Sequence, residues 1–410
     1  MNMQNILYLY IDPSTGSMLF AVIVGMVSAL FFGFRTLVMK IKSRLGVNLK
    51  DVQDKNKLDY VIFSDHKRYW NVFEPICDEF EKRGIEVHYW TMSEDDPALS
   101  KPYKCVKCEY IGTGNKAFAK LNFMNAKICL STTPGLDVYQ WKRSKGCDCY
   151  VHIAHTSGLN RAGYKMFGLD YFDVFLGASE HHGDFIRELE VKRGLSQKEI
   201  ICVGSTYLDE MEKRYKAVEK VKNDVPVVLI APSWGDSCLL ERFGDNILDA
   251  AIATGYKVVV RPHPQTLTQN PKLLNKMQSK YQEIEWNFDN DNFDILNRSD
   301  IMISDFSGVI FDYSLIFDKP VIHTKTDFDW SLYDGAILED NSWTDKMLSK
   351  FSVELTSDNM NNLKNVIDDM LNNDKFKVGR AEVKGEIWQN IGKAKILVVD
   401  YLIKKANELK

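Results

Sequence analysis

The sequence has no excess of basic residues. Its 52 lysines and arginines are outnumbered by 56 aspartates and glutamates, and the formal net charge is −4 at pH 7. A dedicated nucleic-acid-binding protein usually carries a strong basic excess, so we expect no nucleic-acid partner. The chain also lacks internal repeats and low-complexity segments. Its 410 residues, 45% hydrophobic and 26% charged, suit a globular protein of two or three domains.

Cysteines are few and scattered, so they predict no disulfide framework. The 8 cysteines include a Cys105-x-x-Cys108 pair and a Cys147-x-Cys149 pair. A four-cysteine zinc site is the alternative, but the second spacing is too short for the usual knuckle and the flanks add no ligands. We therefore expect reduced thiols, no metal site and no cofactor.

No lysine or arginine precedes the first apolar run, so the charged start of a signal peptide is missing. The 22 uncharged residues from Pro13 to Phe34 would form a helix about 33 Å long, enough to cross a bilayer. Basic residues follow at Arg35, Lys40, Lys42 and Arg44. This charge distribution predicts a single-pass anchor in the cell membrane, over residues 1–48, with the rest of the chain cytoplasmic.

Downstream, short apolar runs alternate with longer amphipathic runs such as residues 70–83, a pattern that predicts parallel sheets covered by helices. We expect an N-terminal Rossmann-like domain over residues 49–224 and a C-terminal one over 225–410, closed by a helix over 391–409. The first strand is followed by Asp65-His66-Lys67-Arg68 and not by a glycine fingerprint, so a standard dinucleotide site is not supported. Candidate strands lie at 59–64, 85–91, 126–131, 150–154, 174–178, 200–204, 225–231, 256–260, 284–286, 301–304 and 320–323.

Two strand ends of the second domain carry polar residues suited to an anion. The strand 256–260 breaks at Arg261-Pro262-His263-Pro264, because neither proline can donate to a sheet. The strand 301–304 ends in Ser304-Asp305-Phe306-Ser307-Gly308, just before a predicted helix whose free N–H groups would face the ligand. Both loops should lie at one edge of the sheet. The structural alternative is a rigid turn at His263 and a helix cap at Asp305 and Ser307.

Three other loops are candidates. His155 and Thr156 follow the strand 150–154, where an imidazole suits a general base, although an ordinary surface histidine is the alternative. Ser233 follows the first strand of the second domain, and Tyr207 and Asp209 lie in an expected interdomain loop. The stretch 289–292 resembles a metal-binding Asp-x-Asp, but we interpret it as a polar turn and helix cap.

The motifs occur in an order that resembles the CDP-glycerol glycerophosphotransferase family, the primases and polymerases of teichoic acids. The resemblance covers residues 150–402 and implies a GT-B fold, with two Rossmann-like domains facing a cleft and the donor held mainly by the second. It implies a general base at His155, with donor phosphates handled by His263 and the Ser304-Asp305-x-Ser307 loop. The motifs are His155-Thr156, Gly204-x-x-Tyr207-x-Asp209, Ala231-Pro232-Ser233-Trp234, Arg261-Pro262-His263-Pro264, Ser304-Asp305-Phe306-Ser307 and Lys319-Pro320-Val321-Ile322.

The chain departs from the family pattern at four of these loops. The family's usual Trp-His-Gly-Thr-Pro is here Ala154-His155-Thr156-Ser157-Gly158, so only the histidine and nearby small polar residues carry over. Tyr207 and Gly235 each stand where the family often has an arginine, and Gly308 replaces the second serine of the phosphate loop. The expected roles are assigned as follows: catalysis to His155, His263 and Asp305; donor and phosphate binding to Arg261, Ser304, Ser307, Gly308 and Ser233; acceptor or interdomain contacts to Thr156, Tyr207 and Asp209.

The sequence therefore predicts a membrane-anchored transferase. It would move a glycerol-phosphate-like unit from a CDP-linked donor to a hydroxyl of a lipid-linked or surface polymer. One alternative is a GT-B glycosyltransferase that uses a nucleotide sugar, and another is a non-catalytic membrane-tethered scaffold of a polymer assembly complex. A homo-oligomer is compatible with the sequence, which selects neither the donor nor the acceptor.

Overall fold

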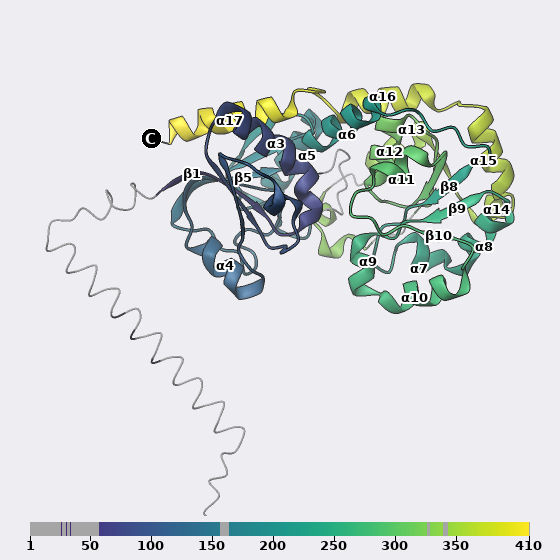
Figure 1. Cartoon of the computed structure of the whole chain (residues 1–410), viewed down its shortest axis with the longest axis horizontal. Coiled ribbons are helices and arrows are strands. Elements are labelled where there is room, and N and C mark those ends of the chain that lie inside the picture. The colour runs from purple at the N-terminus through teal and green to yellow at the C-terminus, as the bar shows by residue number, and fades with distance from the viewer. Residues whose placement is uncertain are drawn as a thin grey trace, which may run out of the picture. The chain divides into compact units, whose positions relative to one another are not determined.

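The computed structural model describes residues 57–155, 164–325, 329–338 and 343–409, together with Met26, Leu30 and Gly33. Residues Leu58–Lys410 form one compact unit (Figure 1). Apart from those three residues, which are helical, the expected anchor over 13–34 and its basic flank lie outside the described residues. Across the described part of the chain, no helix combines the length and the apolar composition needed to cross a bilayer.

The first sheet is entirely parallel and has seven strands in the order β3-β2-β1-β4-β5-β6-β7. β1 lies between β2 and β4, so the direction of strand addition reverses between β1 and β4. Ligands of open α/β sheets bind beyond the carboxyl ends of the strands at such a reversal. The strands are β1 Leu58–Ser64, β2 Val87–Thr91, β3 Val106–Tyr110, β4 Asn125–Ser131, β5 Gly146–Ile153, β6 Val174–Gly177 and β7 Glu199–Cys202.

The second sheet repeats this arrangement with six parallel strands in the order β10-β9-β8-β11-β12-β13. Its reversal lies between β8 and β11. The α/β architecture with parallel sheets is thus the expected one. The strands are β8 Val227–Ile230, β9 Lys257–Val260, β10 Glu285–Trp286, β11 Ile301–Ser304, β12 Val321–His323 and β13 Ser352–Glu354.

Two strands were not expected, β3 and β13, and both lie at sheet edges. In β3, Lys107 and Glu109 are exposed and only Val106 is buried, so this strand lacks the apolar run that marks a central strand. β13 has three residues, of which only Ser352 is buried. Sheet edges need little apolar surface, and hydrophobic patterning therefore detects them poorly.

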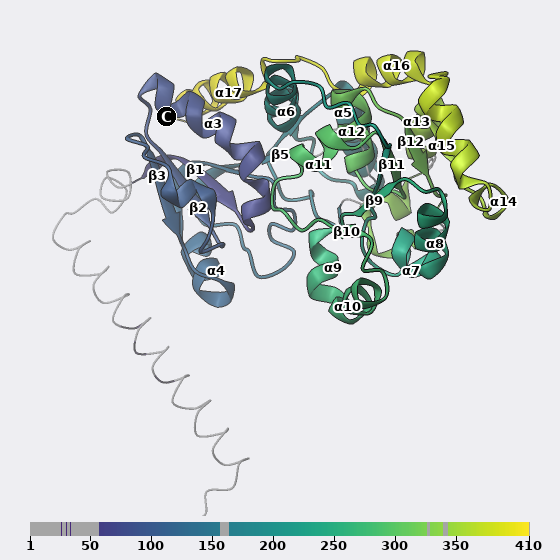
Figure 2. The ribbon, with the colours of Figure 1, turned by 45° about the vertical axis from the view of Figure 1, so that its right-hand side comes forward.

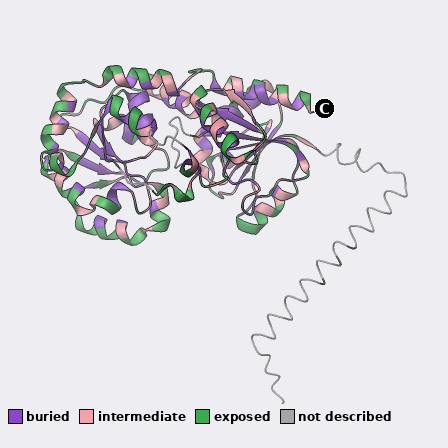
Figure 3. Cartoon of the chain, turned by 180° about the vertical axis from the view of Figure 1, so that it is seen from behind, coloured by how far each residue is buried: buried purple, intermediate pink, exposed green. Residues whose placement is uncertain are grey.

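The helices cover both sheets, with their buried faces inward and exposed faces outward (Figure 3). α3 spans Trp70–Arg83 as predicted and buries Phe73, Ile76 and Phe80 against the first sheet. The described helices of four or more residues also include α4 Gly114–Asn122, α5 Glu180–Arg193, α6 Thr206–Ala217, α7 Leu239–Phe243, α8 Asp245–Ala253, α9 Pro264–Gln269, α10 Pro271–Lys280, α11 Phe293–Arg298, α12 Val309–Phe317, α13 Trp343–Phe351, α14 Ser357–Met360, α15 Leu363–Asn372, α16 Lys377–Ile387 and α17 Ala394–Glu408.

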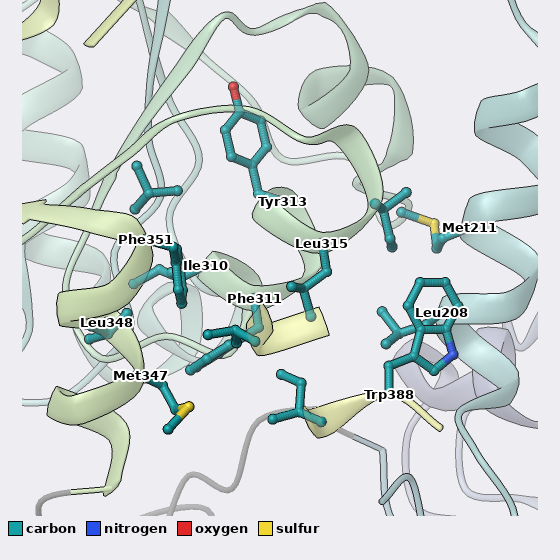
Figure 4. Packing of buried hydrophobic residues seen from close by; sticks show 14 of the residues in the cluster. Leu208, Met211, Ile310, Phe311, Tyr313, Leu315, Met347, Leu348, Phe351 and Trp388 are labelled. Atoms are coloured by element: carbon teal, nitrogen blue, oxygen red, sulfur yellow. The ribbon is translucent and has the colours of Figure 1, made fainter. Parts of the chain in front are cut away.

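The last helix packs on the first sheet, although the sequence placed it in the range of the second domain. Val398, Val399 and Leu402 of α17 belong to the same apolar cluster as β1 and α3. Figure 2 shows α17 beside α3, after the chain has returned from α16. A second apolar cluster joins α6 to α12 and α13, through residues such as Leu208, Leu315 and Phe351 (Figure 4). Apolar packing thus links α6, which follows the last strand of the first sheet, to α12 and α13 beside the second sheet.

Candidate functional site

At the reversal in the first sheet, the loops after β1 and β4 are held together by short side chains. The hydroxyl of Thr133 donates to the carboxylate of Asp65 at 3.0 Å, and the hydroxyl of Ser131 donates to the carbonyl of Phe63 at 2.8 Å. Thr132, between them, contacts His155, which follows the neighbouring strand β5. The sheet therefore places His155 beside its own reversal point.

His155 is held as a neutral imidazole. Its Nδ1 lies 2.9 Å from the hydroxyl of Thr132, and its ring lies 5.0 Å from that of Tyr69, centroid to centroid. Burial, and after it the positive charge of Arg68, lowers the pKa of His155 to about 4. The tautomer in which Nδ1–H donates to Thr132 leaves a lone pair on Nε2, as a general base requires. Thr156, the next residue of the motif, lies outside the described residues.

At the reversal in the second sheet, Asp305 organises the loop after β8. Its buried carboxylate accepts from the backbone N–H groups of Ser233, at 3.0 Å, and of Leu239, at 2.7 Å. Burial raises the pKa of Asp305, an effect that these hydrogen bonds oppose. The family resemblance assigned Asp305 to catalysis, whereas its hydrogen bonds hold the β8 loop and the start of α7. Asp305 is thus placed as a positioning residue.

Of the other small residues at this reversal, Ser304 and Ser233 are buried and Ser307 is half-buried. Ser304 is fully buried and its hydroxyl donates to the carbonyl of Ala231 at 2.5 Å, so it ties β11 to β8. Ser233 is buried beside the carboxylate of Asp305, which accepts its backbone N–H. Ser307 is half-buried in the turn before α12, and Gly308 is the N-cap residue of this nine-residue helix. Its N-terminus favours negative charge.

His263 is a neutral hydrogen-bond donor. It caps α9, and its Nδ1 accepts the backbone N–H of Gln265 at 3.1 Å. Burial, with smaller contributions from Arg68 and Arg261, lowers the pKa of His263 to about 4. With Nδ1 accepting in a neutral ring, the proton is on Nε2. This nitrogen can therefore donate to a phosphate oxygen but cannot take a proton.

Arg261 is anchored within its own domain. Its guanidinium donates to the side chain of Asn287 and, at 2.7 Å, to the carbonyl of Asp289. Burial lowers the pKa of Arg261, but the group stays charged at neutral pH. In the adjacent turn, the carboxylate of Asp291 accepts the N–H of Phe293 at 3.0 Å at the start of α11. This agrees with a polar turn and helix cap at 289–292.

Tyr207 and Asp209 are placed between domains. The hydroxyl of Tyr207 lies 3.2 Å from the side-chain nitrogen of Asn292, which precedes α11. Asp209 accepts from the indole of Trp388 at 3.2 Å and from the backbone N–H of Ala394 at 3.0 Å, which fastens the start of α17. Burial raises the pKa of Asp209. Tyr207 thus contacts a loop beside the second sheet, and Asp209 holds the segment that leads into α17.

The cysteine pairs lie in or beside strands, with Cys147 and Cys149 on β5 and Cys108 on β3. Burial raises the pKa of Cys108 to about 11 and that of Cys147 to about 12. Among the described residues, no three His, Cys, Asp or Glu side chains gather as a metal site would require. A cavity of about 790 Å³ lies between α8 and α14–α15 and is lined by none of the predicted site residues.

Four side chains at the strand ends were missed from the sequence. Arg68 and Tyr69 follow β1, Thr132 follows β4, and Gln265 follows His263. The segment 65–68 was considered only for the glycine fingerprint that it lacks. Its position directly after a strand at the reversal of the sheet could have identified it, because ligands bind at such a position whether or not the loop contains glycines.

Comparison with known proteins finds a family model and a curated relative that this chain resembles. Residues 187–339 match the family model described as CDP-glycerol:poly(glycerophosphate) glycerophosphotransferase. The chain is 21% identical over 241 residues to the teichoic acid glycerol-phosphate primase of Bacillus spizizenii strain W23, a match that covers 56% of this chain and 61% of that protein.

Solved structures agree at the level of the fold. A structure of the wall teichoic acid polymerase TagF aligns over 94% of this chain and 99% of its own, with a TM-score of 0.56 and 16% identity. A putative UDP-N-acetylglucosamine 2-epimerase from Listeria monocytogenes aligns over 86% and 98%, with a TM-score of 0.54 and 14% identity. These neighbours have the GT-B-like architecture of two parallel sheets. These structures show the fold of this chain, and residues 187–339 together with the primase match show where its sequence resembles the CDP-glycerol glycerophosphotransferase family.

Proposed function

We propose that this chain transfers a polyol-phosphate unit, such as glycerol phosphate, from a CDP-activated donor to a hydroxyl group of a polymer acceptor. The observation that carries the proposal is the pair of neutral histidines, His155 after β5 of the first sheet and His263 after β9 of the second. The two imidazoles can act in opposite ways. In the tautomer that donates Nδ1–H to Thr132, Nε2 of His155 accepts a proton, whereas Nε2 of His263 donates a hydrogen bond.

His155 is the base in this mechanism. A polymer hydroxyl is a weak nucleophile near neutral pH, so its proton passes to Nε2 of His155 as its oxygen attacks the β-phosphorus of the donor. The new bond joins the acceptor oxygen to this phosphorus, and the bond between the phosphorus and the bridging oxygen breaks. CMP leaves with that oxygen. The hydrogen bond between Nδ1 and Thr132 stabilises the imidazolium that forms.

The second sheet supplies the donor site. Negative charge grows on the phosphate oxygens during transfer, where Nε2–H of His263 and the backbone N–H groups at the start of α12 can stabilise it. Ser233 follows β8 at the same reversal, where its backbone N–H is held by Asp305. Asp305 holds the Ser233 loop in place and Arg261 holds the 287–289 loop. The residues of the proposed mechanism require no metal ion.

The acceptor and the location follow from the relatives and from the N-terminal sequence. The curated relative is a teichoic acid glycerol-phosphate primase, of which the match spans 61%, so a surface polymer is the proposed acceptor class. The apolar run 13–34 and its basic flank support a single membrane anchor. It would hold the catalytic unit on the cytoplasmic side, close to a lipid-linked acceptor.

The decisive test is the identity of the nucleotide released. Purified protein is incubated with CDP-glycerol, CDP-ribitol and a panel of nucleotide sugars, in the presence of a polymer or lipid-linked acceptor. Polyol-phosphate transfer releases CMP, because the bond between the two phosphates breaks. Transfer of a sugar breaks a bond at the anomeric carbon and releases a nucleoside diphosphate. Release of UDP or GDP would replace the proposal by a glycosyltransferase, and no release from any donor would favour a scaffold.

A further inference from the structure

Arg68 lies on the first sheet at its reversal point. It belongs to the turn Lys67–Tyr69, which begins three residues after the end of β1. The backbone N–H of Arg68 donates to Nδ1 of His66 at 3.2 Å, and this bond fixes the start of the turn. Since β1 pairs with β4, Arg68 shares the edge of the sheet that carries Thr132 and His155.

The guanidinium group of Arg68 lies between the two histidines of the site. Its central carbon is 5.0 Å from the ring centroid of Tyr69, whose ring is 5.0 Å from that of His155. On its other side are residues of the second domain. With the Gln265 amide turned so that its oxygen accepts, Nη1 and Nη2 of Arg68 donate to it at 3.2 and 3.3 Å. Gln265 in turn donates its backbone N–H to His263.

The charge of Arg68 has no partner carboxylate in the part of the chain that the structure describes. Among the described residues, Arg68 forms no ion pair with a carboxylate, and its Nε is buried without a hydrogen-bond partner. Its positive charge contributes to lowering the pKa of both His155 and His263. A partly buried cation without a paired carboxylate is costly unless an anion binds there. Gln265 accepts only one of the two N–H groups on each terminal nitrogen of Arg68.

We propose that Arg68 is a further binding residue for the diphosphate of the nucleotide donor, which it reaches from the first domain while His263 reaches it from the second. This inference rests on the proposed function, because it takes the ligand to be a nucleoside diphosphate. The planar guanidinium can donate hydrogen bonds to two phosphate oxygens at once. The hydrogen bonds to Gln265 restrict the orientation of this group. Arg68 would thereby restore a cation to a cleft in which Tyr207 and Gly235 replace the arginines of the family pattern.

A purely structural Arg68 would act differently. It would brace α9 through Gln265, and its loss would lower the stability of the fold without a selective effect on phosphate binding. The ligands tested must therefore distinguish the contribution of the diphosphate to binding from that of the nucleoside. CDP, CMP and inorganic pyrophosphate do so, since CMP lacks the β-phosphate and pyrophosphate lacks the nucleoside.

The experiment is calorimetric titration of the full chain in EDTA with these three ligands. Arg68→Gln should weaken the binding of CDP and pyrophosphate by roughly ten- to a hundredfold, as expected for loss of a charge-assisted hydrogen bond, and that of CMP by much less. Arg68→Lys keeps the charge but lacks the planar guanidinium. Its affinity for CDP and pyrophosphate should lie between those of the wild type and of Arg68→Gln. Arg298→Gln is the matched control, because Arg298 pairs with Glu285 at an exposed site on α11. Thermal unfolding of each variant verifies that it is folded.

Three outcomes would overturn the inference: unchanged CDP and pyrophosphate affinity in both Arg68 variants, an equal loss for CMP and CDP, or no binding of any diphosphate by the wild-type chain. An error in the proposed CDP donor can be distinguished from these three outcomes. If the wild-type chain binds UDP or GDP and not CDP, the CDP donor is wrong. The Arg68 variants are then compared on the diphosphate that binds, against its own monophosphate.

Discussion

The carboxylate of Asp305 accepts the backbone N–H of Leu239 at 2.7 Å, across 66 residues of sequence. The same carboxylate accepts the N–H of Ser233, so one buried side chain joins the loops that follow β8 and β11. A carboxylate beside phosphates is repulsive, and the structure gives it another task. Asp305 therefore positions the loop that carries Ser233, a residue of the proposed phosphate site.

Asp305→Ala should therefore lower stability as well as donor binding. It leaves two buried N–H groups without acceptors, which we expect to cost about 3 kcal/mol of unfolding free energy. Urea denaturation measures this loss. Asp236→Ala, an exposed position in the same loop, is the control and should change the unfolding free energy by less than about 0.5 kcal/mol. A fully stable Asp305→Ala protein that has lost only turnover would return Asp305 to the catalytic residues.

His155→Ala should reduce turnover by roughly 10²–10⁴ while leaving CDP affinity nearly unchanged, because the base acts on the acceptor hydroxyl. Steady-state rates and calorimetry on the same preparation separate the two effects. His88→Ala removes an imidazole on β2 that pairs with Glu86, away from the reversal point, and serves as the control. Weaker CDP binding with normal turnover of bound substrate would place His155 in the donor site instead.

His263→Ala and Ser307→Ala should each weaken donor binding by roughly ten- to a hundredfold, or lower turnover if the contact forms only in the transition state. Titration of CDP in EDTA, followed by rate measurements, checks this. Ser279→Ala on the exposed helix α10 is a control for loss of a hydroxyl. If affinity and turnover are both unchanged in the two variants, these loops are structural turns.

Stability should fall as the pH falls from about 6.5 to 4. Both His155 and His263 have a folded-state pKa of about 4, against an ordinary value of 6.5. In this window the unfolded chain binds protons at these histidines that the folded chain does not, so acid favours unfolding. Each histidine should cost about 2 kcal/mol at pH 5. Urea denaturation at pH 7 and pH 5 should show a smaller loss in the His155→Gln variant than in the wild type. An identical loss would mean that His155 titrates normally.

The full chain should remain with membranes after a high-salt wash, and a C-terminal reporter should be cytoplasmic. The reason is the uncharged run from Pro13 to Phe34 and the four basic residues that follow it. A chain that begins at Lys57 is the control and should not sediment with membranes. Release of full-length protein by alkaline carbonate would exclude a spanning helix.

The linear sequence by itself determined most of the strands and the loops between them. Central strands such as β9 are continuous apolar runs because both faces are buried, and the Arg261-Pro262-His263-Pro264 break follows from the backbone chemistry of proline. The same local rules predicted α3 with its bounds. The edge strands β3 and β13 were missed, since an edge position needs little apolar surface.

Only the tertiary structure decided which side chains meet. The pairing of β1 with β4 brings Arg68 and Thr132 to His155, and the approach of α9 brings Gln265 to Arg68, across nearly 200 residues. It likewise turned Asp305 toward Leu239 and placed α17 on the first sheet. A sequence pattern indicates which face of a single helix or strand is buried. These contacts depend on strand order and on packing between elements, which a local pattern does not predict.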